Sequence, residues 1–303
     1  MDRLRAFEVF AAVVSRGGFA RAADALDTSP ANVTRYVSEL EGHLGTRLLN
    51  RTSRRVSLTE AGEALYERAR AILDDVAEAE AATTASAAAA QGRLRINAPL
   101  VFGIRHLAPL WPRFMALHPN VELDIALTDR VVDIVEEGYD LGIRISRGGS
   151  QSYVSRKLAT SRNILCASPA YLAKHGVPDH PAALADHGCV IYGYAPEPDV
   201  WTFLDSTGSE TRVRVGTRLR TNSGDTARAV ALAGEAITWQ PSFLIGEDLR
   251  AGTLVPLLPD WRLPDIDILA LYASRRHLSA KVRLMVDFLA DAFRGTPPWE
   301  SGI

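Results

Sequence analysis

Three short segments with apolar residues at helical spacing follow one another in the first 44 residues, and they restrict the N-terminal fold more than any other feature. The first, "LRAFEVFAAVV", ends at Gly17-Gly18, and the second, "FARAADALDT", carries small alanines on its apolar face. Ser29 then has the chemistry of an N-cap, and Pro30 suits the first position of a third helix that runs to about Leu44. Three short helices, the last two joined by a tight turn, predict a helix-turn-helix.

Charge is unevenly distributed along the chain, although its net value is only -2. Residues 1–58 contain nine arginines and six acidic residues, whereas residues 59–90 contain two arginines and seven acidic residues. Two short strand-like runs surround the polar sequence "NRTSRR", and arginines at the tip of such a hairpin can contact phosphates or a minor groove. A basic head on an acidic stalk predicts that DNA contact is confined to the head.

A helix-turn-helix reads DNA because exposed residues in the first turns of its last helix reach base edges in the major groove. Asn32 has the amide chemistry to pair with adenine, and Arg35 can pair with guanine or a phosphate. The same helix could belong to a structural helical hairpin, but the arginine-rich wing favours DNA binding. The predicted DNA-binding residues are Ser29, Pro30, Ala31, Asn32, Thr34, Arg35, Tyr36, Arg51, Arg54 and Arg55.

The alanine-rich run from Thr59 to about Ala90 predicts one long helix. Its larger apolar positions alternate four and three apart, which is the spacing of a dimeric coiled coil. These positions are Leu65, Ala69, Ile72, Val76 and Ala79. A helix packed on its own domain is the alternative, because the strong positions span only about two heptads.

The pattern changes at Gly92 to alternating strands and helices. The runs "RLRINAP", "GIRHLAPLWPRFMALHP", "VELDIALTD", "RVVDIVEEG" and "YDLGIRIS" predict a βαβαβ arrangement with parallel strands. Further strands are expected at "NILCAS", "RLRTNS", "AITWQP" and "DILALYAS", and helices at "SPAYLAKHG", "DTARAVALAGE" and "SAKVRLMVDFLADAF". The predicted fold class is α/β overall, with an all-α winged helix-turn-helix at the N-terminus.

Signatures of catalysis and metal binding are missing from the sequence. It contains no GxxxxGK[ST], GxSxG, HExxH, GxGxxG or EF-hand motif, and its seven histidines lack metal-ligand spacing. We therefore expect no enzyme activity, no cofactor and no metal. His106 and His118 are expected at surface or capping positions, and Cys166 and Cys189 as reduced packing residues.

Neither a membrane span nor a secretion signal is evident in the sequence. No run approaches the roughly 18 to 20 apolar residues that a bilayer requires, and Met1 leads into a mixed polar and apolar segment. We expect a cytoplasmic protein without membrane contact.

The sequence from Leu4 to Gly62 resembles the DNA-binding head of LysR-type transcription regulators. It departs from many members at two positions, with Pro30 in place of glutamine and Thr34 in place of serine. The first change removes one amide contact. The matching features are the small-residue helix, Leu40-Glu41, the step from Gly45 to Leu49, Arg51-Thr52 and the closing "LTEAG" from Leu58.

The resemblance continues to about Phe293. "NAPLVFGIRHLAPLWPRFMALHP" and "CASPAYLAKHG" resemble the sensor of the subgroup allied to regulators of aromatic and organic-acid metabolism. This implies two α/β subdomains shaped like a periplasmic binding protein, crossed by the chain near Thr160 and Asp265, with an effector between them. The expected domains are a head (1–58), a linker and dimerisation helix (59–90) and an effector-binding domain (91–303). The last comprises subdomain I, about 91–160 and 266–303, and subdomain II, about 161–265.

The residue pattern points to the same cleft, because ligands of α/β sheets gather at strand C-termini beside helix N-termini, whose N–H groups attract carboxylates. Thr128, Ser146 and Ser223 could bond an anion that Arg144 pairs with. Arg144 could instead be a structural salt-bridge residue, Ser223 a helix cap, and Trp239 part of the core. The predicted effector-binding residues are Ala98, Pro99, Leu100, Thr128, Arg144, Ser146, Asn222, Ser223, Trp239, Gln240 and Pro241.

The expected function is a sequence-specific DNA-binding transcription regulator, controlled by a small organic acid or aromatic metabolite. The expected partners are double-stranded DNA, RNA polymerase and further copies of the chain. The resemblance implies a tetramer, whereas the predicted coiled-coil seam supports a dimer at most. A solute-binding protein or enzyme with a helical assembly domain is one alternative. A nucleoid-type DNA binder without an effector is the other.

Overall fold

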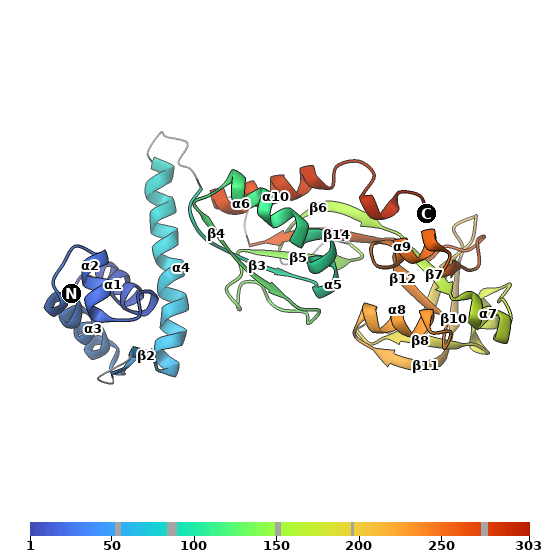
Figure 1. Ribbon diagram of the computed structural model, residues 1–303, viewed down its shortest axis with the longest axis horizontal. Coiled ribbons are helices and arrows are strands. Elements are labelled where there is room, and N and C mark those ends of the chain that lie inside the picture. Colours follow the sequence, from blue (N-terminus) through green and yellow to red (C-terminus); the bar gives the residue numbers. More distant parts are fainter. Residues whose placement is uncertain (52–55, 84–89, 149–152, 195–196, 274–277) are drawn as a thin grey trace. The chain divides into compact units, whose positions relative to one another are not determined.

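The computed structural model describes residues 1–303 except 52–55, 84–89, 149–152, 195–196 and 274–277 (Figure 1). Contacts divide the chain into two compact units, Met1–Gly92 and Arg93–Ile303. Among the described residues, no helix is both long enough and apolar enough to cross a bilayer.

The first unit is a winged helix-turn-helix followed by a long helix, which confirms the predicted fold of this region. Antiparallel pairing joins the two wing strands, with Leu49 opposite Leu58. The elements are α1 (Arg3–Ser15), α2 (Phe19–Ala25), α3 (Pro30–Leu44), β1 (Leu49–Arg51), β2 (Val56–Leu58) and α4 (Glu60–Thr83).

The first turns of α4 belong to the core of the head. The ring of Tyr66 meets that of Phe10 edge-on at 6.3 Å, and Ala69 is fully buried. A Cβ atom on Gly62 would lie 1.9 Å from the carbonyl oxygen of Leu48, so only glycine fits there. Ile72, farther along the predicted coiled-coil seam, is 43% exposed. The early part of the seam therefore packs on its own domain, as in the alternative considered above.

A five-stranded sheet forms what we call the first subdomain of the second unit. Its order is β4-β3-β5-β14-β6, with β3 and β5 parallel and β14 antiparallel to β5 and β6. The expected all-parallel arrangement is therefore only partly realised. The strands are β3 (Gly92–Ala98), β4 (Val121–Leu127), β5 (Leu141–Ser146), β6 (Val154–Ser161) and β14 (Ile266–Tyr272), and α10 (Ala280–Ala292) packs against β6.

Two predicted helices of this subdomain differ in the structure. The run "RVVDIVEEG" forms turns, because the Asp133 carboxylate accepts from the backbone N–H groups of Val135 and Glu136, and Gly138 adopts a φ of 70°. The run around "GIRHLAPLW" is divided by Pro109 and Pro112 into short pieces. These are α5 (Leu100–Phe102), the π-helical turn η1 (Gly103–Leu107), the 3-10 turn η2 (Ala108–Leu110) and α6 (Trp111–Leu117).

Three small sheets form the second subdomain. They are β12-β7-β13, the parallel pair β8-β11 and the antiparallel pair β9-β10. All four strands and all three helices that were predicted after residue 160 are present, whereas β6, β8, β9, β10, β13 and α9 were not predicted. The elements are β7 (Asn163–Ala167), α7 (Pro169–His175), η3 (Pro181–Ala185), β8 (Gly188–Tyr192), β9 (Val200–Leu204), β10 (Glu210–Arg214), β11 (Gly216–Thr221), α8 (Gly224–Leu232), β12 (Thr238–Pro241), α9 (Ser242–Ala251) and β13 (Val255–Pro256).

The chain crosses between the subdomains twice, and the two crossings lie side by side (Figure 1). One joins β6 to β7 at Arg162, and the other leads through Pro264 and Asp265 into β14. The Asn163 amide donates to the carbonyl of Pro264 at 2.8 Å, and Ser161 pairs with Ile266 in the sheet.

Candidate DNA-binding face and effector site

The third helix presents one face to the core and one to the surface. Val33, Val37 and Leu40 are buried. The Ser29 side chain accepts from the backbone N–H of Asn32 at 3.2 Å, and Gly45 ends the helix in the left-handed conformation. The predicted DNA-binding residues of this helix lie on the opposite face. Ser29, Pro30, Ala31, Asn32, Thr34 and Arg35 are exposed, and Tyr36 is half-buried.

Local contacts orient the polar side chains of this face. The Asn32 amide donates to the hydroxyl of Thr28 at 3.3 Å, and the Thr34 hydroxyl donates to the carbonyl of Pro30 at 2.9 Å. The Arg35 guanidinium lies 5.3 Å from the centroid of the Tyr36 ring. Because the Thr34 hydroxyl is bonded to the helix backbone, its methyl group is the part of the side chain left for outward contacts. The Tyr36 ring partly orients the Arg35 side chain in the absence of DNA.

The wing is fastened directly to the recognition helix. A Glu41 carboxylate oxygen accepts from the backbone N–H groups of Leu48 and Leu49 at 2.9 and 3.2 Å. The Thr59 hydroxyl donates to the carbonyl of Arg47 at 2.7 Å. Sequence reasoning matched Glu41 to a family pattern without assigning it this role. Arg54, Arg55 and the side chain of Arg51 lie outside the described residues.

In the first subdomain, four predicted effector-binding residues meet where β3 and β4 end. The backbone N–H of Thr128 donates to the carbonyl of Ala98 at 2.9 Å. Pro99 precedes α5, and the N–H of Leu100 donates to the Asp129 carboxylate at 3.0 Å. Asp129 therefore closes this strand end, although only its neighbour Thr128 was among the predicted effector-binding residues.

Arg144 and Ser146 make contacts within the first subdomain. The Arg144 guanidinium donates to the side-chain oxygen of Asn97 at 2.7 Å and to the carbonyl of Ile143 at 2.8 Å. Burial lowers the pKa of Arg144. The Ser146 hydroxyl donates to the carbonyl of Gly148 at 3.1 Å. These hydrogen bonds hold Arg144 within the first subdomain.

In the second subdomain, the remaining predicted residues lie around the starts of α8 and α9. The Ser223 hydroxyl caps α8 through the N–H of Thr226 at 3.2 Å, and the Asn222 amide donates to the Tyr194 hydroxyl at 3.1 Å. Gln240 is buried and donates to the Thr238 hydroxyl. Trp239 packs against the apolar core, and Pro241 precedes α9. Ser223 and Trp239 thus adopt the capping and packing roles considered as alternatives.

Arg105 and His106 join the two sets of residues. The Arg105 guanidinium donates to the carbonyl of Leu244 at 2.8 Å and to the Asp225 carboxylate at 2.7 Å. His106 Nε2 lies 2.9 Å from the carbonyl oxygen of Phe243. Burial lowers the pKa of His106.

The expectations for the two histidines of this region have different outcomes. The expected surface or capping position is only partly met by His106, which is half-buried because its imidazole packs among aromatic rings between the subdomains. It is confirmed for His118, which is the C-cap of α6.

A tyrosine faces this region from the end of β8. Burial, and then the negative charge of Asp129, raise the pKa of Tyr192 to about 12. The rings of Tyr192 and Tyr194 meet edge-on at 5.9 Å. Sequence reasoning did not assign Arg105, Asp129, Tyr192 or Asp225 to the site, although Asp129 ends a predicted strand and Asp225 begins a predicted helix. Strand ends alone do not reveal which neighbours face one another across two subdomains.

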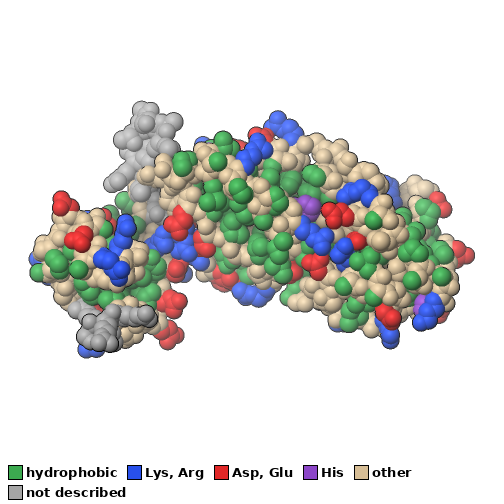
Figure 2. All heavy atoms as spheres, viewed as in Figure 1, with side chains coloured by type: hydrophobic (Ala, Val, Ile, Leu, Met, Phe, Trp, Pro, Cys, Tyr) green, Lys and Arg blue, Asp and Glu red, His purple; other side chains and the backbone are tan. Residues whose placement is uncertain are grey.

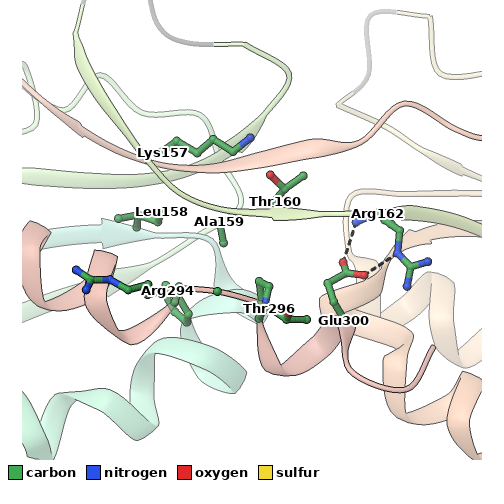
Figure 3. Close-up of a pocket in the computed structure, with 11 residues that line it drawn as sticks. Lys157, Leu158, Ala159, Thr160, Arg162, Arg294, Thr296 and Glu300 are labelled. Carbon is green, nitrogen blue, oxygen red and sulfur yellow. Dashed lines mark hydrogen bonds and ion pairs between the residues drawn. The ribbon is translucent and has the colours of Figure 1, made fainter.

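A separate pocket of about 540 Å³ lies between β6 and the segment that follows α10 (Figure 3). None of the predicted effector-binding residues lines it. Its cations are paired with acids, as Lys157 with Asp267 at 2.6 Å and Arg162 with Glu300 at 2.6 Å. The lining residues are Lys157, Leu158, Ala159, Thr160, Arg162, Phe293, Arg294, Gly295, Thr296, Pro297 and Glu300.

Cys166 and Cys189 are free and buried, as expected for reduced packing residues. Burial raises the pKa of the Cys189 thiol to about 12. Within the described residues, no group of three or more His, Cys, Asp or Glu side chains is arranged to hold a metal ion.

Comparison with known proteins covers both units. Residues 4–63 match the family described as "Bacterial regulatory helix-turn-helix protein, lysR family", and residues 87–294 match the "LysR substrate binding domain". The chain is 37% identical to the HTH-type transcriptional regulator DmlR of Escherichia coli, over 96% of this chain and 94% of that protein. It is 33% identical to the regulator CrgA of Neisseria meningitidis serogroup C, over 93% and 94% of the two chains.

Solved structures of full-length regulators resemble the chain along most of its length. CrgA from Neisseria meningitidis matches with a TM-score of 0.61 and 32% identity, over 96% of this chain and 99% of that one. The virulence activator AphB of Vibrio cholerae matches with a TM-score of 0.58 and 31% identity, over 95% and 98%. The helix-turn-helix head, the two-subdomain sensor and these matches together identify the chain as a member of the LysR family of DNA-binding transcription regulators with an effector-binding domain.

Proposed function

We propose that this regulator acts in the cytoplasm as a homo-oligomer, a dimer or a tetramer, that reads a pseudo-palindromic operator through the exposed face of α3 and the arginines of the wing. The main support is the recognition helix itself. Its apolar side is buried, while Asn32, Thr34 and Arg35 are exposed and held by local contacts. Such a face suits base-edge readout in a major groove.

Replacing Arg35 by alanine tests the base-reading role. We expect a loss of specific operator affinity of about 10- to 100-fold, the range for one base-reading arginine. The measurement is footprinting, at stated salt, across the promoter next to the coding sequence and on a random fragment. Arg212→Ala is the matched control, because it removes the same charge from the sensor, where Arg212 pairs with Glu197. Equal operator affinity in the Arg35 and Arg212 variants would contradict this role.

Replacing an arginine of the wing should affect DNA binding differently from replacing Arg35. Arg54→Ala should weaken binding to operator and random DNA by similar factors and reduce the salt dependence, because a phosphate contact carries no sequence information. Loss of operator binding alone, with random DNA unaffected, would assign Arg54 to base readout instead.

We propose that the effector is a small organic acid or aromatic metabolite bound where Leu100, Thr128, Asn222 and Ser223 lie at the facing ends of the two subdomains. The Arg105–Asp225 ion pair and the Tyr192 ring supply polar and aromatic surface there. Binding would shift the equilibrium between two subdomain orientations by the difference in affinity for them. A thermal-shift screen of the full chain with dicarboxylates and substituted benzoates tests this class, and loss of every response in Thr128→Val would locate the site.

Self-association is supported by apolar side chains that gather over the first subdomain (Figure 2). Ile104 is 55%, Met115 52% and Leu117 58% exposed. Large exposed apolar residues in one region commonly mark protein contacts.

RNA polymerase is a further proposed partner, and we propose that the protein performs no chemistry. Family membership weighs against the solute-binding and enzyme alternatives, whereas a response of operator binding to a small molecule would exclude the nucleoid-type alternative.

A further inference from the structure

The segment Pro297–Ile303, which follows α10, contacts both subdomains of the sensor. Its Trp299 side chain is 4% exposed and inserts among aromatic residues of the first subdomain. The indole lies 4.6 Å from the His106 ring, 5.5 Å from the Phe102 ring and 5.4 Å from the Phe293 ring, measured between centroids. These contacts anchor one side of the segment in the first subdomain by apolar burial.

The other side of the segment is bonded to the second subdomain. The Glu300 carboxylate accepts from the Arg162 backbone N–H at 3.0 Å and from Arg162 Nε at 2.6 Å (Figure 3). It also accepts from the hydroxyl of Ser242, the first residue of α9. Burial opposes ionisation, yet these hydrogen bonds outweigh it and lower the pKa of Glu300. The carboxylate is therefore a charged anchor at the start of α9.

Backbone contacts extend this attachment along α9. The Arg250 guanidinium donates to the carbonyl of Ser301 at 2.9 Å, and Arg162 donates to the carbonyl of Ile303 at 3.0 Å. A Cβ atom on Gly246 would lie 3.0 Å from the Trp299 carbonyl oxygen, so the segment passes directly over α9. The segment thus adds noncovalent contacts, beside those of Arg105 and His106 with α9, across a junction where the described chain crosses between the subdomains at Arg162 and at Asp265.

We propose that Pro297–Ile303 is a strap that holds the two subdomains in one relative orientation and thereby sets the balance of states on which an effector acts. The effector-dependent part of this inference rests on the proposed function, whereas the mechanical part does not. Arg162, which holds Glu300, lies between β6 and β7, so the strap bonds directly to one of the two crossings. Releasing it would leave the two crossings and the contacts of Arg105 and His106 with α9 as the links between the subdomains, and would widen the range of their relative orientations.

A distance measurement in the full chain tests the mechanical part. Spin labels at Val131→Cys and Val177→Cys, which are 80% and 65% exposed, report one position in each subdomain. The native cysteines are buried and leave the labelling to the introduced thiols. Dilution with unlabelled protein suppresses distances between copies. We expect a narrow distribution with the intact strap, and a shifted or broadened one in Glu300→Gln, whose amide cannot accept equivalent bonds from Arg162 and Ser242.

Two further variants and a control make this test decisive. Trp299→Ala should broaden the distribution by removing the aromatic anchor, and Gly246→Ala should do so by displacing the strap from α9. Glu197→Gln, which removes the exposed ion pair with Arg212, should leave the distribution unchanged. An unchanged distribution in folded Glu300→Gln and Gly246→Ala would overturn the strap.

Operator footprinting with the same variants, and no added small molecule, tests the regulatory part. We expect the Glu300→Gln footprint to differ in extent from that of the unaltered protein, while affinity for random DNA changes less than twofold. A changed distance with an identical footprint would overturn the link to regulation. If the unaltered protein binds no operator, the proposed function fails, while the distance measurement still decides the strap.

Discussion

Contacts of single residues in the head explain several residues of the LysR-family sequence pattern. Gly62 closes the motif "LTEAG", and the structure supplies the reason, since the helix passes so close to Leu48 that a side chain cannot fit. Glu41 fastens the wing through two backbone N–H groups, and Thr59 fastens the start of α4. The roles of Glu41 and Thr59 do not follow from local spacing, because their partners lie 7, 8 and 12 residues away in the chain.

Replacing Gly62 by alanine should destabilise the head by about 1–3 kcal/mol, because the new methyl group would overlap the Leu48 carbonyl and force the backbone to shift. Gly42→Ala in α3 is the matched control, since nothing lies within 4 Å of its added Cβ atom. That control should be neutral or slightly stabilising. Urea unfolding of the full chain measures both, and equal midpoints in the two variants would contradict the close approach.

At the scale of elements, helix caps and helix-breaking side chains explain which predicted helices are present. α3 was predicted with Ser29 as its cap, and the structure has that cap, whereas Ser223 was predicted to bind the effector and caps α8 as in the alternative. "RVVDIVEEG" was predicted as a helix from closely spaced apolar residues, yet only Val132 and Ile134 are buried, and Val131 and Val135 are exposed. The Asp133 side chain competes for the N–H groups that a helix would need, and sequence periodicity does not weigh that competition.

The Ser29 cap yields a prediction for α3. Ser29→Ala should lower the free energy of unfolding by about 1 kcal/mol, because the N–H of Asn32 loses its acceptor. Ser29→Asp retains an acceptor and should recover most of that stability. The midpoint of urea unfolding gives the comparison without relying on DNA affinity, which the same residue is proposed to influence. An alanine variant as stable as the original would exclude capping by Ser29.

For the whole molecule, the sequence predicted the order of head, long helix and α/β sensor, but not how the two parts of the sensor are joined. Arg105 and His106 are consecutive in a π-helical turn, and both contact backbone carbonyls of α9. Pro109 and Pro112 interrupt the helical pattern just after that turn. The side chains of Arg105 and His106 therefore do not follow the positions of a regular α-helix. Such contacts between distant segments cannot be inferred from spacing along one segment.

The junction predicts a dependence of stability on pH. Burial lowers the pKa of His106 below 6.5, with the charge of Arg105 acting in the same direction and the Phe243 carbonyl and Glu247 opposing it. The unfolded chain therefore takes up the proton first, and stability is lost as the pH falls below about 6.5. Urea midpoints measured against pH should fall less steeply in His106→Phe.

A second histidine provides the comparison for this experiment. Burial also lowers the pKa of His187, which belongs to the second subdomain, so some acid sensitivity should persist in His106→Phe. The same slope in His106→Phe and in the unaltered protein would show that the junction does not contribute.

The strap also affects which fragment boundary should be chosen for studies of the isolated sensor. The match to the family's sensor domain ends at residue 294, whereas Trp299 and Glu300 lie beyond it. On our proposal, a sensor fragment trimmed at that boundary would lack the strap and would sample orientations that the full chain rarely visits. Because apparent affinity scales with the fraction of molecules in the binding-competent orientation, ligand titrations of the trimmed and full chains would report different dissociation constants for an identical binding site.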